Sequence, residues 1–186
     1  YDQANDKITF APDNDDVAAG VTFNCNVNDG TVNSATTLYF SATVNNVNDA
    51  PTFAYNANAN VTSWAGSGTS GAPYTFDVAE DSTTGEVSFA IADVDAGDDP
   101  QISCASKPDW VSYDQANDKI TFTPDNDDVA TGVTFNCKAN DGTADSAATI
   151  YFSVNVTNTN DAPTFAYTAN ANVTSWAGSG TSGSPY

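Results

Sequence analysis

Residues 150–165 read IYFSVNVTNTNDAPTF, and residues 38–53 read LYFSATVNNVNDAPTF. In both stretches apolar and polar residues alternate at the start, which is the period of a strand that is buried on one face. An Asn- and Asp-rich stretch then leads to a proline, which removes a backbone donor and keeps the preceding residue extended. The pattern predicts a β-strand followed by a stiff connector that carries oxygen ligands.

These two stretches belong to a long internal repeat. Residues 1–74 match residues 113–186 one for one, and about four-fifths of the aligned positions are identical. We therefore interpret the chain as a window onto a tandem array, cut out of phase with its repeat. With the connector as the boundary, residues 1–49 are the C-terminal half of one repeat domain, residues 50–161 are a complete domain, and residues 162–186 begin the next.

The complete domain shows the alternating pattern in several more segments, which are separated by clusters of Asp, Asn, Gly and Pro. Helical periodicity is not visible anywhere. Short strands with frequent turns are typical of an antiparallel β-sandwich of about seven strands. The sequence therefore predicts an all-β fold made of tandem sandwich domains.

The charge of the chain is strongly negative, with 24 acidic residues against 4 basic ones and no histidine. This balance argues against nucleic acid and anionic membrane surfaces as partners, and it favours cations. The hydrophobic residues make up 40% of the chain and alternate strictly with polar ones, so we expect a folded chain despite its high negative charge. No apolar run is long enough for membrane insertion. Without histidine there is no usual catalytic triad or zinc site, so we do not expect an enzyme.

Two of the three cysteines are predicted to pair. Cys137 is in phase with the apolar residues before it, so its side chain should point into the core, and Cys104 lies in another apolar run. A disulfide between them would link strands across the sandwich and would indicate an extracellular or cell-surface location. The alternative is three reduced core cysteines. Cys25 corresponds to Cys137, with its expected partner upstream of the first residue, so we do not expect a reactive thiol.

Oxygen-bearing side chains occupy four loops of each unit in addition to the connector. Calcium takes six to eight oxygen ligands from such loops. Each loop alone also fits ordinary turn chemistry, because Asp-Gly and Asn-Asp pairs are common turn formers. Many clustered carboxylates repel one another without a cation, so we favour calcium. The acidic loop residues are Glu80, Asp93, Asp95, Asp125, Asp127, Asp128 and Asp141.

The order of these loops resembles the cadherin fold and its bacterial cadherin-like relatives, the tandem modules of large adhesins. In that family a glutamate, an Asp-x-Asp, an Asp-Arg-Glu, an Ala-x-Asp-x-Gly and the connector hold calcium between successive domains. The most specific match is Asn-Asp-Ala-Pro-Thr-Phe, at 48–53 and 160–165. The chain departs from the pattern at Asn46, where the family has Asp, and at 126–127, where Asn-Asp replaces Arg-Glu. Residues 107–114 separately resemble a bacterial Ig-like repeat.

The resemblance implies two calcium-binding joints, with neighbouring repeats of the same chain as partners. The first joint would use Asp13, Asp15, Asn48, Asp49, Asp93, Asp95 and Asp141. The second would use Glu80, Asp125, Asp127, Asn160 and Asp161.

The repeated segment 56–73, which returns at 168–185, is rich in Gly, Ser, Thr, Ala and Asn and contains one tryptophan, Trp64 in the first copy. It fits a glycosylated loop, a contact between copies, a sugar-binding spot, or a flexible insertion whose tryptophan packs on the domain edge. Possible N-glycosylation sites are Asn60, Asn155 and Asn172.

Together these patterns predict an extracellular structural or adhesive spacer, a rod stiffened by Ca²⁺ at its joints. One alternative is a repeating subunit of an extracellular filament, in which copies associate through the Trp64 segment. Another is a carbohydrate-binding module that uses the same tryptophan. The possible partners are then other copies in a fibre or a surface ligand.

Overall fold

The protein is all-β in the computed structural model, which describes residues 2, 4–166 and 177–185. Three short 3₁₀ turns accompany the strands: η1 (Asn14–Asp16), η2 (Gln115–Asn117) and η3 (Asn126–Asp128). The strands are β1 (Ala18–Cys25), β2 (Leu38–Val44), β3 (Thr52–Ala59), β4 (Thr62–Ala65), β5 (Tyr74–Ala79), β6 (Gly85–Ala92), β7 (Gln101–Ala105), β8 (Val111–Asp114), β9 (Lys119–Phe122), β10 (Ala130–Asn140) and β11 (Ile150–Thr157).

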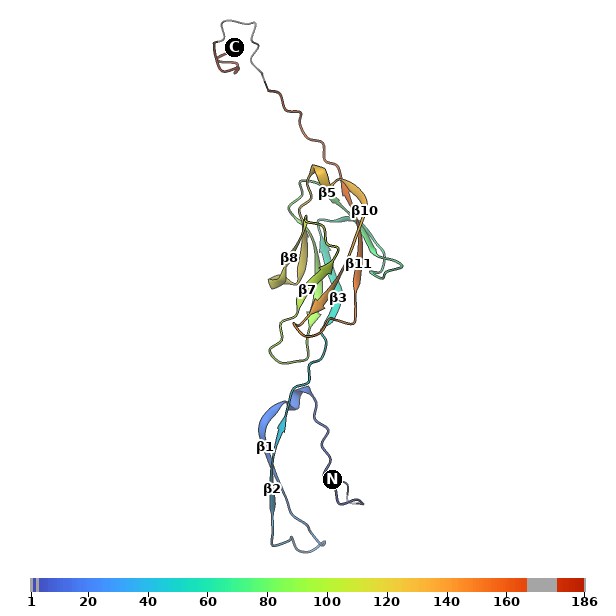
Figure 1. Ribbon diagram of the computed structural model, residues 1–186, viewed down its shortest axis with the longest axis vertical. Helices are drawn as coiled ribbons and strands as arrows, with labels where there is room; N and C mark the ends of the chain where they lie inside the picture. The colour runs from blue at the N-terminus through green and yellow to red at the C-terminus, as the bar shows by residue number, and fades with distance from the viewer. Residues whose placement is uncertain (1, 3, 167–176, 186) are drawn as a thin grey trace.

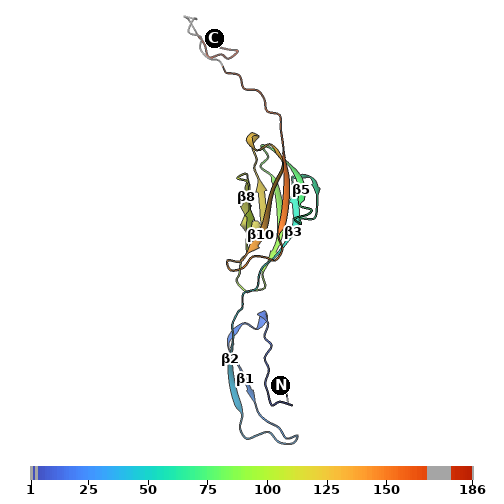
Figure 2. The same cartoon turned by 45° about the vertical axis from the view of Figure 1, so that its right-hand side comes forward.

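Strands β3 to β11 form two sheets that face each other (Figures 1 and 2). The five-stranded sheet has the order β4-β5-β11-β10-β7, and the four-stranded sheet has the order β3-β6-β9-β8. The alternating residues of both sheets meet in one core, because every second side chain of each strand points inward. Phe76 and Phe152 from one sheet and Val87, Ile120 and Phe122 from the other are almost completely buried. Each such side chain stabilises the fold by about 1.5–3 kcal/mol.

One strand pair is parallel, whereas the sequence pattern predicted only antiparallel pairs. Strand β5 pairs in parallel with β11, from Phe152 opposite Tyr74 to Thr157 opposite Ala79. The reason is that the chain changes sheets between β3, which pairs with β6, and β4, which pairs with β5. Asn60 lies at this crossing with a left-handed φ of 55°, a conformation that Asn adopts more readily than most residues.

The segment 56–73 is more regular than a flexible insertion, because it includes the end of β3 and all of β4. Trp64 of β4 stacks on Tyr55 and on Phe76, with ring centroids 4.9 and 5.1 Å apart. The tryptophan therefore packs against the edge of the core. The strand was not predicted because its small polar residues carry little alternation.

The predicted disulfide between Cys104 and Cys137 is present. It does not run across the sandwich as expected, because the two cysteines face each other on neighbouring strands β7 and β10 of one sheet. Cys137 is fully buried, as its phase predicted. Cys25 is a free cysteine.

Strands β1 and β2 form a separate two-stranded sheet that lies beyond one end of the sandwich (Figure 1). Their register copies that of β10 and β11, including an irregularity between Ala18 and Val21 that matches the one between Ala130 and Val133. Residues 45–51 connect this hairpin to β3 without regular structure.

Candidate functional site

The connector between the hairpin and the sandwich is held by side chains from three parts of the chain. The Asp49 backbone N–H donates to Asp95 Oδ2 at 2.7 Å, and Asn48 Nδ2 donates to Asp141 Oδ2 at 3.0 Å. Asn14 of η1 donates from Nδ2 to Asp49 Oδ2 at 2.9 Å and to Asp95 Oδ1 at 3.3 Å. Asp95 is buried, and both of its carboxylate oxygens accept these hydrogen bonds in a region with little water.

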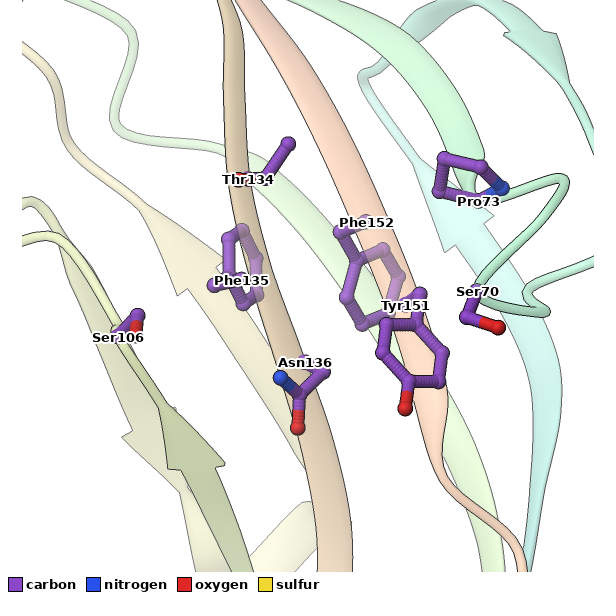
Figure 3. A pocket seen from close by; sticks show the side chains of 8 residues that line it. All are labelled: Ser70, Pro73, Ser106, Thr134, Phe135, Asn136, Tyr151 and Phe152. Atoms are coloured by element: carbon purple, nitrogen blue, oxygen red, sulfur yellow. The ribbon is translucent and has the colours of Figure 1, made fainter.

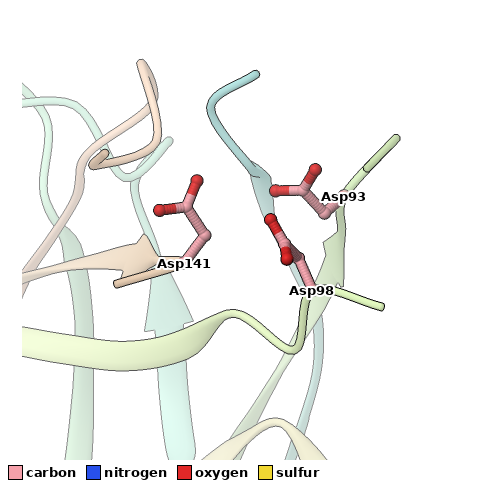
Figure 4. Close-up of side chains that lie close together, drawn as sticks. All are labelled: Asp93, Asp98 and Asp141. Carbon is pink, nitrogen blue, oxygen red and sulfur yellow. The ribbon is translucent and has the colours of Figure 1, made fainter. Parts of the chain in front are cut away.

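Three carboxylates of the sandwich lie close to one another beside this connector (Figure 4). Asp93 follows β6, Asp98 lies in the loop before β7, and Asp141 follows β10. Each offers an oxygen, and these oxygens all lie within 4.8 Å of one another. Asp93 Oδ1 accepts from the Asp95 N–H, whereas its buried Oδ2 has no hydrogen-bond partner among the described residues.

The pKa values of two carboxylates in this cluster, Asp98 and Asp141, are shifted in opposite directions. Partial desolvation raises the pKa of the Asp98 carboxyl, and the charges of Asp93, Asp95 and Asp141 raise it further. Hydrogen bonds from the Ala144 and Thr143 backbone N–H groups lower the pKa of Asp141. These hydrogen bonds favour the charged form of Asp141, whereas desolvation and the neighbouring charges disfavour the charged form of Asp98.

The predicted ligands of the preceding segment lie at the edge of the joint. Asp13, Asn14 and Asp15 line an open cavity of about 450 Å³ together with Val94. Asp13 caps η1 by accepting from the Asp15 N–H, so its carboxylate performs the turn chemistry that was the alternative to metal binding.

Glu80 is the most buried acidic residue of the second predicted joint, with 2% of its surface exposed. Its Oε1 accepts from the Thr159 N–H at 2.6 Å, while Oε2 is buried without a hydrogen-bond partner among the described residues. A buried carboxylate with one unused oxygen is costly unless a donor or a cation meets it.

The other residues of the second joint repeat the contacts of the first. Asn126 donates from Nδ2 to Asp161 Oδ2, as Asn14 does to Asp49. Asn160 Nδ2 donates to Asp161 O at 3.1 Å. Asp125 caps η3 through the Asp127 N–H, and the Asp127 side chain is exposed. Hydrogen bonds therefore join Asn160 to Asp161 and Asp125 to Asp127, whereas Glu80 accepts from Thr159, which is not one of the predicted ligands.

The donor set at the first joint fits a hard cation such as Ca²⁺, which prefers carboxylate and carbonyl oxygens. Asn48, Asp49, Asp93, Asp95 and Asp141 lie together there, while their binding of an ion stays a prediction. Sequence reasoning missed Asn14 and Asp98, which the fold adds. The Asp98-Asp99 pair was visible inside an acidic loop, but nothing in the sequence indicated which of the two lies close to Asp93 and Asp141.

The predicted glycosylation sites have different surroundings. Asn60 is exposed and donates from Nδ2 to Thr84 O at 3.0 Å. Asn155 is engaged on both sides, since it donates to Asp77 Oδ1 and accepts from the Gly132 N–H. A glycan attached to Asn155 Nδ2 would disrupt the hydrogen bond to Asp77. Asn172 lies outside the described residues.

A second cavity, of about 310 Å³, lies over β10 and β11 (Figure 3). Its lining contains no charged side chain, although the chain as a whole is strongly acidic. The lining residues are Ser70, Pro73, Ser106, Thr134, Phe135, Asn136, Tyr151 and Phe152.

No family model and no curated protein matches the chain. One solved structure that it resembles is an endo-fucoidan hydrolase of glycoside hydrolase family 107, at 22% identity and a TM-score of 0.32. The match covers 77% of this chain and 19% of that protein. A likeness this weak carries no argument about fold or activity. In the described part of the chain, no helix has the length and apolar character needed to span a membrane.

Proposed function

We propose that the chain is an extracellular spacer of cadherin-like or Ig-like repeats, whose joints bind Ca²⁺ and become stiff when they do. One observation carries the proposal. Side chains from the preceding segment, the connector and the sandwich converge at one joint, around Asp93, Asp98 and Asp141. Partial desolvation and then repulsion from neighbouring carboxylates raise the pKa of Asp98, and a cation there would offset the repulsion. Because its ligands would belong to both sides of the connector, binding would also restrict the angle between them.

The extracellular assignment rests on the disulfide between Cys104 and Cys137, because such bonds persist in oxidising compartments. The role is mechanical, and no catalytic step is part of the proposal.

The test compares the chain in Ca²⁺ and in chelator. At a hundredfold excess over Kd, binding adds about 2.7 kcal/mol to the stability of the sandwich, which raises Tm on the order of 10 °C. Small-angle X-ray scattering should show a narrower distribution of dimensions at the same time. An unchanged Tm and unchanged dimensions would contradict the proposal.

The matched variants locate the ion. Combining Asp93→Asn with Asp98→Asn should abolish the response to Ca²⁺, because it removes two carboxylates of the cluster. Asp109→Asn removes an exposed acid elsewhere and should leave the response intact. Equal responses in both variants would place the ion outside this joint.

A carbohydrate-binding role is the second candidate. The uncharged cavity beside Tyr151 is a better candidate for the sugar-binding place than Trp64, because Trp64 is packed against the core. Aromatic and neutral polar groups suit the faces and hydroxyls of a sugar. Tyr151→Ala should abolish retention on a glycan array if this role is real, and a chain that binds no glycan rules it out.

A further inference from the structure

The edge strands of the sandwich are β3 and β8 in one sheet and β4 and β7 in the other. Each has one side without a neighbouring strand, where unpaired N–H and C=O groups can bind a strand of another molecule. Soluble proteins usually cover such edges, or make them short, charged or irregular. An edge that lacks all of these protections is available for pairing.

Side chains cover the free side of β7. Gln115 binds both backbone groups of Ile102, because its Oε1 accepts from the Ile102 N–H at 2.8 Å and its Nε2 donates to Ile102 O at 2.9 Å. The hydroxyl oxygen of Tyr113 accepts from the Cys104 N–H at 2.9 Å. These side chains take the place of a neighbouring strand, so β7 cannot pair with another molecule without losing their hydrogen bonds.

The edges of β8 and β4 are protected in other ways. At β8, the Val111 N–H donates to Pro108 O, and Lys107 Nζ donates to Val111 O, which places a positive charge beside the edge. Strand β4 has only four residues, and its pairing with β5 is irregular between Thr62 and Ala65. Charged, short and irregular edges resist pairing with another molecule.

Strand β3 is eight residues long, and its free side has backbone groups that are ready to pair. The Phe89 N–H of β6 donates to Asp118 O and therefore points away from β3. Its partner on β3 is Tyr55, so Tyr55 directs its own N–H and C=O to the free side, as does Phe53 two residues earlier. Among the residues that the structure describes, no hydrogen bond reaches these groups.

The side of the sandwich that carries β3 is also poor in charge. No charged residue occurs from position 50 to 76, although 15% of the chain is charged and its net charge is -20. Trp64 of β4 stacks on Tyr55 of β3, so both uncharged strands lie on this side. Glu86 of β6, opposite the end of β3, forms an ion pair with Lys119 at 2.8 Å. Two copies of so acidic a chain repel each other, and this side lets them approach with the least repulsion.

We propose that β3 pairs with β3 of a second copy of this chain, so that the two four-stranded sheets become one continuous sheet. Identical edges that meet about a twofold axis run antiparallel, and each strand then satisfies the unpaired backbone groups of the other. Trp64 stays packed in its own sandwich. The contact therefore differs from association through the Trp64 segment, which the sequence suggested.

A second β3 fits this edge in length, charge and shape. It has the same eight residues and no charge, so no carboxylate is brought against another. Its exposed side chains near the edge are small or neutral: Thr52, Ala54 and Asn56. Neutral residues of this size pass one another across a paired edge without clash or unpaired charge.

The contact should be weak for one sandwich and stronger for several. A single eight-residue edge buries less than a standard interface of about 1,600 Å², so we expect a Kd on the order of 0.1–1 mM. If the repeats stand in tandem, as in the proposed function, two antiparallel chains could align repeat with repeat. Each further contact would then form within one complex and raise the overall affinity.

The first test measures self-association of the whole chain in chelator, so that its outcome does not depend on Ca²⁺ binding. The Cys25 thiol is blocked beforehand to prevent disulfide-linked dimers. Sedimentation equilibrium at up to about 1 mM protein should show monomers and dimers. Added salt should increase the dimer fraction, because it screens the repulsion between two anionic copies. A chain that stays monomeric at this concentration in salt would overturn the proposal.

Amide hydrogen exchange, measured by NMR, locates the contact without any substitution. The N–H groups of Phe53 and Tyr55 should exchange about twofold more slowly once half of the chains are dimeric. The Ile102 N–H, which Gln115 already binds, should exchange at the same rate at every concentration. Dimers that leave the exchange of Phe53 and Tyr55 unchanged, such as dimers formed through β1 and β2, would contradict the pairing.

Ala54→Asp tests the edge by substitution, and Ser112→Asp is its matched control. Both add one negative charge at an exposed position of the same sheet, the first on β3 and the second on β8 at the opposite edge. Ala54→Asp should raise the Kd of the dimer about tenfold, because like charges then meet across the paired strands. Ser112→Asp should change the Kd by less than about twofold. Equal effects in two variants that circular dichroism shows to be folded would overturn the proposal.

Discussion

The acidic residues at the joints divide between two arrangements that the sequence presents as alternatives. Asp13 and Asp125 cap 3₁₀ turns, as ordinary turn chemistry predicts. Asp93, Asp98 and Asp141 instead gather their oxygens at one point. The loops were predictable from their Asp and Gly content, but which carboxylate turns toward the others depends on loop conformation, which the sequence pattern does not encode.

Replacing Glu80 tests how a buried carboxylate holds the end of the sandwich. Glu80→Ala should lower the free energy of unfolding by about 1–3 kcal/mol, because it leaves the Thr159 N–H without its acceptor. Glu80→Gln keeps that acceptor and should cost less. Urea unfolding in chelator measures both, and equal losses would show that the acceptor is unimportant.

Replacing Asp98 tests the repulsion in the cluster through pH. The pKa of Asp98 is raised in the folded state, so the charged carboxylate costs stability above that pKa and nothing below its ordinary value of 3.8. In chelator, Asp98→Asn should therefore raise Tm at neutral pH, and the gain should fade as pH falls toward 3.8. A gain that is constant with pH would contradict this assignment.

At the scale of elements, alternation identified the strands whose inward residues are large. Strands β6, β9, β10 and β11 follow the predicted pattern of Val, Ile and Phe. Strand β4 did not show it, because a single tryptophan supplies most of its contact with the core. The parallel pairing of β5 with β11 also escaped prediction, since pairing direction follows from the crossing between sheets rather than from any periodicity.

The turn between β4 and β5 depends on Gly66. Gly66 has a φ of 93°, and a Cβ there would lie 2.0 Å from Pro73 O. Gly66→Ala should destabilise the sandwich by at least about 2 kcal/mol. Gly71→Ala, in the same loop with open space around it, should change stability by less than about 0.5 kcal/mol. The midpoints of urea unfolding distinguish the two, and similar midpoints would argue against a strained turn.

The disulfide between β7 and β10 should contribute mainly by restricting the unfolded chain. It closes a loop of 33 residues, which corresponds to about 3–4 kcal/mol in the chain-entropy model. Replacing both Cys104 and Cys137 with Ser should lower the free energy of unfolding by that amount. A much smaller loss, measured by urea unfolding at equilibrium, would indicate that the two strands stay close in the unfolded chain.

For the whole molecule, the repeat was the most informative feature of the sequence. It indicated that residues 1–49 and 113–161 are equivalent, and β1 with β2 indeed copies β10 with β11. Phe10 is 64% exposed and its counterpart Phe122 is 0% exposed, because strands β3 to β8 pack with the second copy and not with the first. Exposure depends on which strands are available to pack, and this is a property of the assembled sheets rather than of any one segment.

The disulfide also determines how the sandwich would respond to a pulling force. Tension applied through residues 51 and 158 acts on β3 and β11, and both strands lie outside the loop closed by Cys104 and Cys137. The 33-residue separation inside that loop cannot lengthen while the bond is intact. At about 3.6 Å per residue, the chain then lengthens by roughly 120 Å less on unfolding than the reduced protein does. The oxidised sandwich therefore absorbs a pulling force over a short, covalently limited extension, and reduction of the disulfide makes that extension longer.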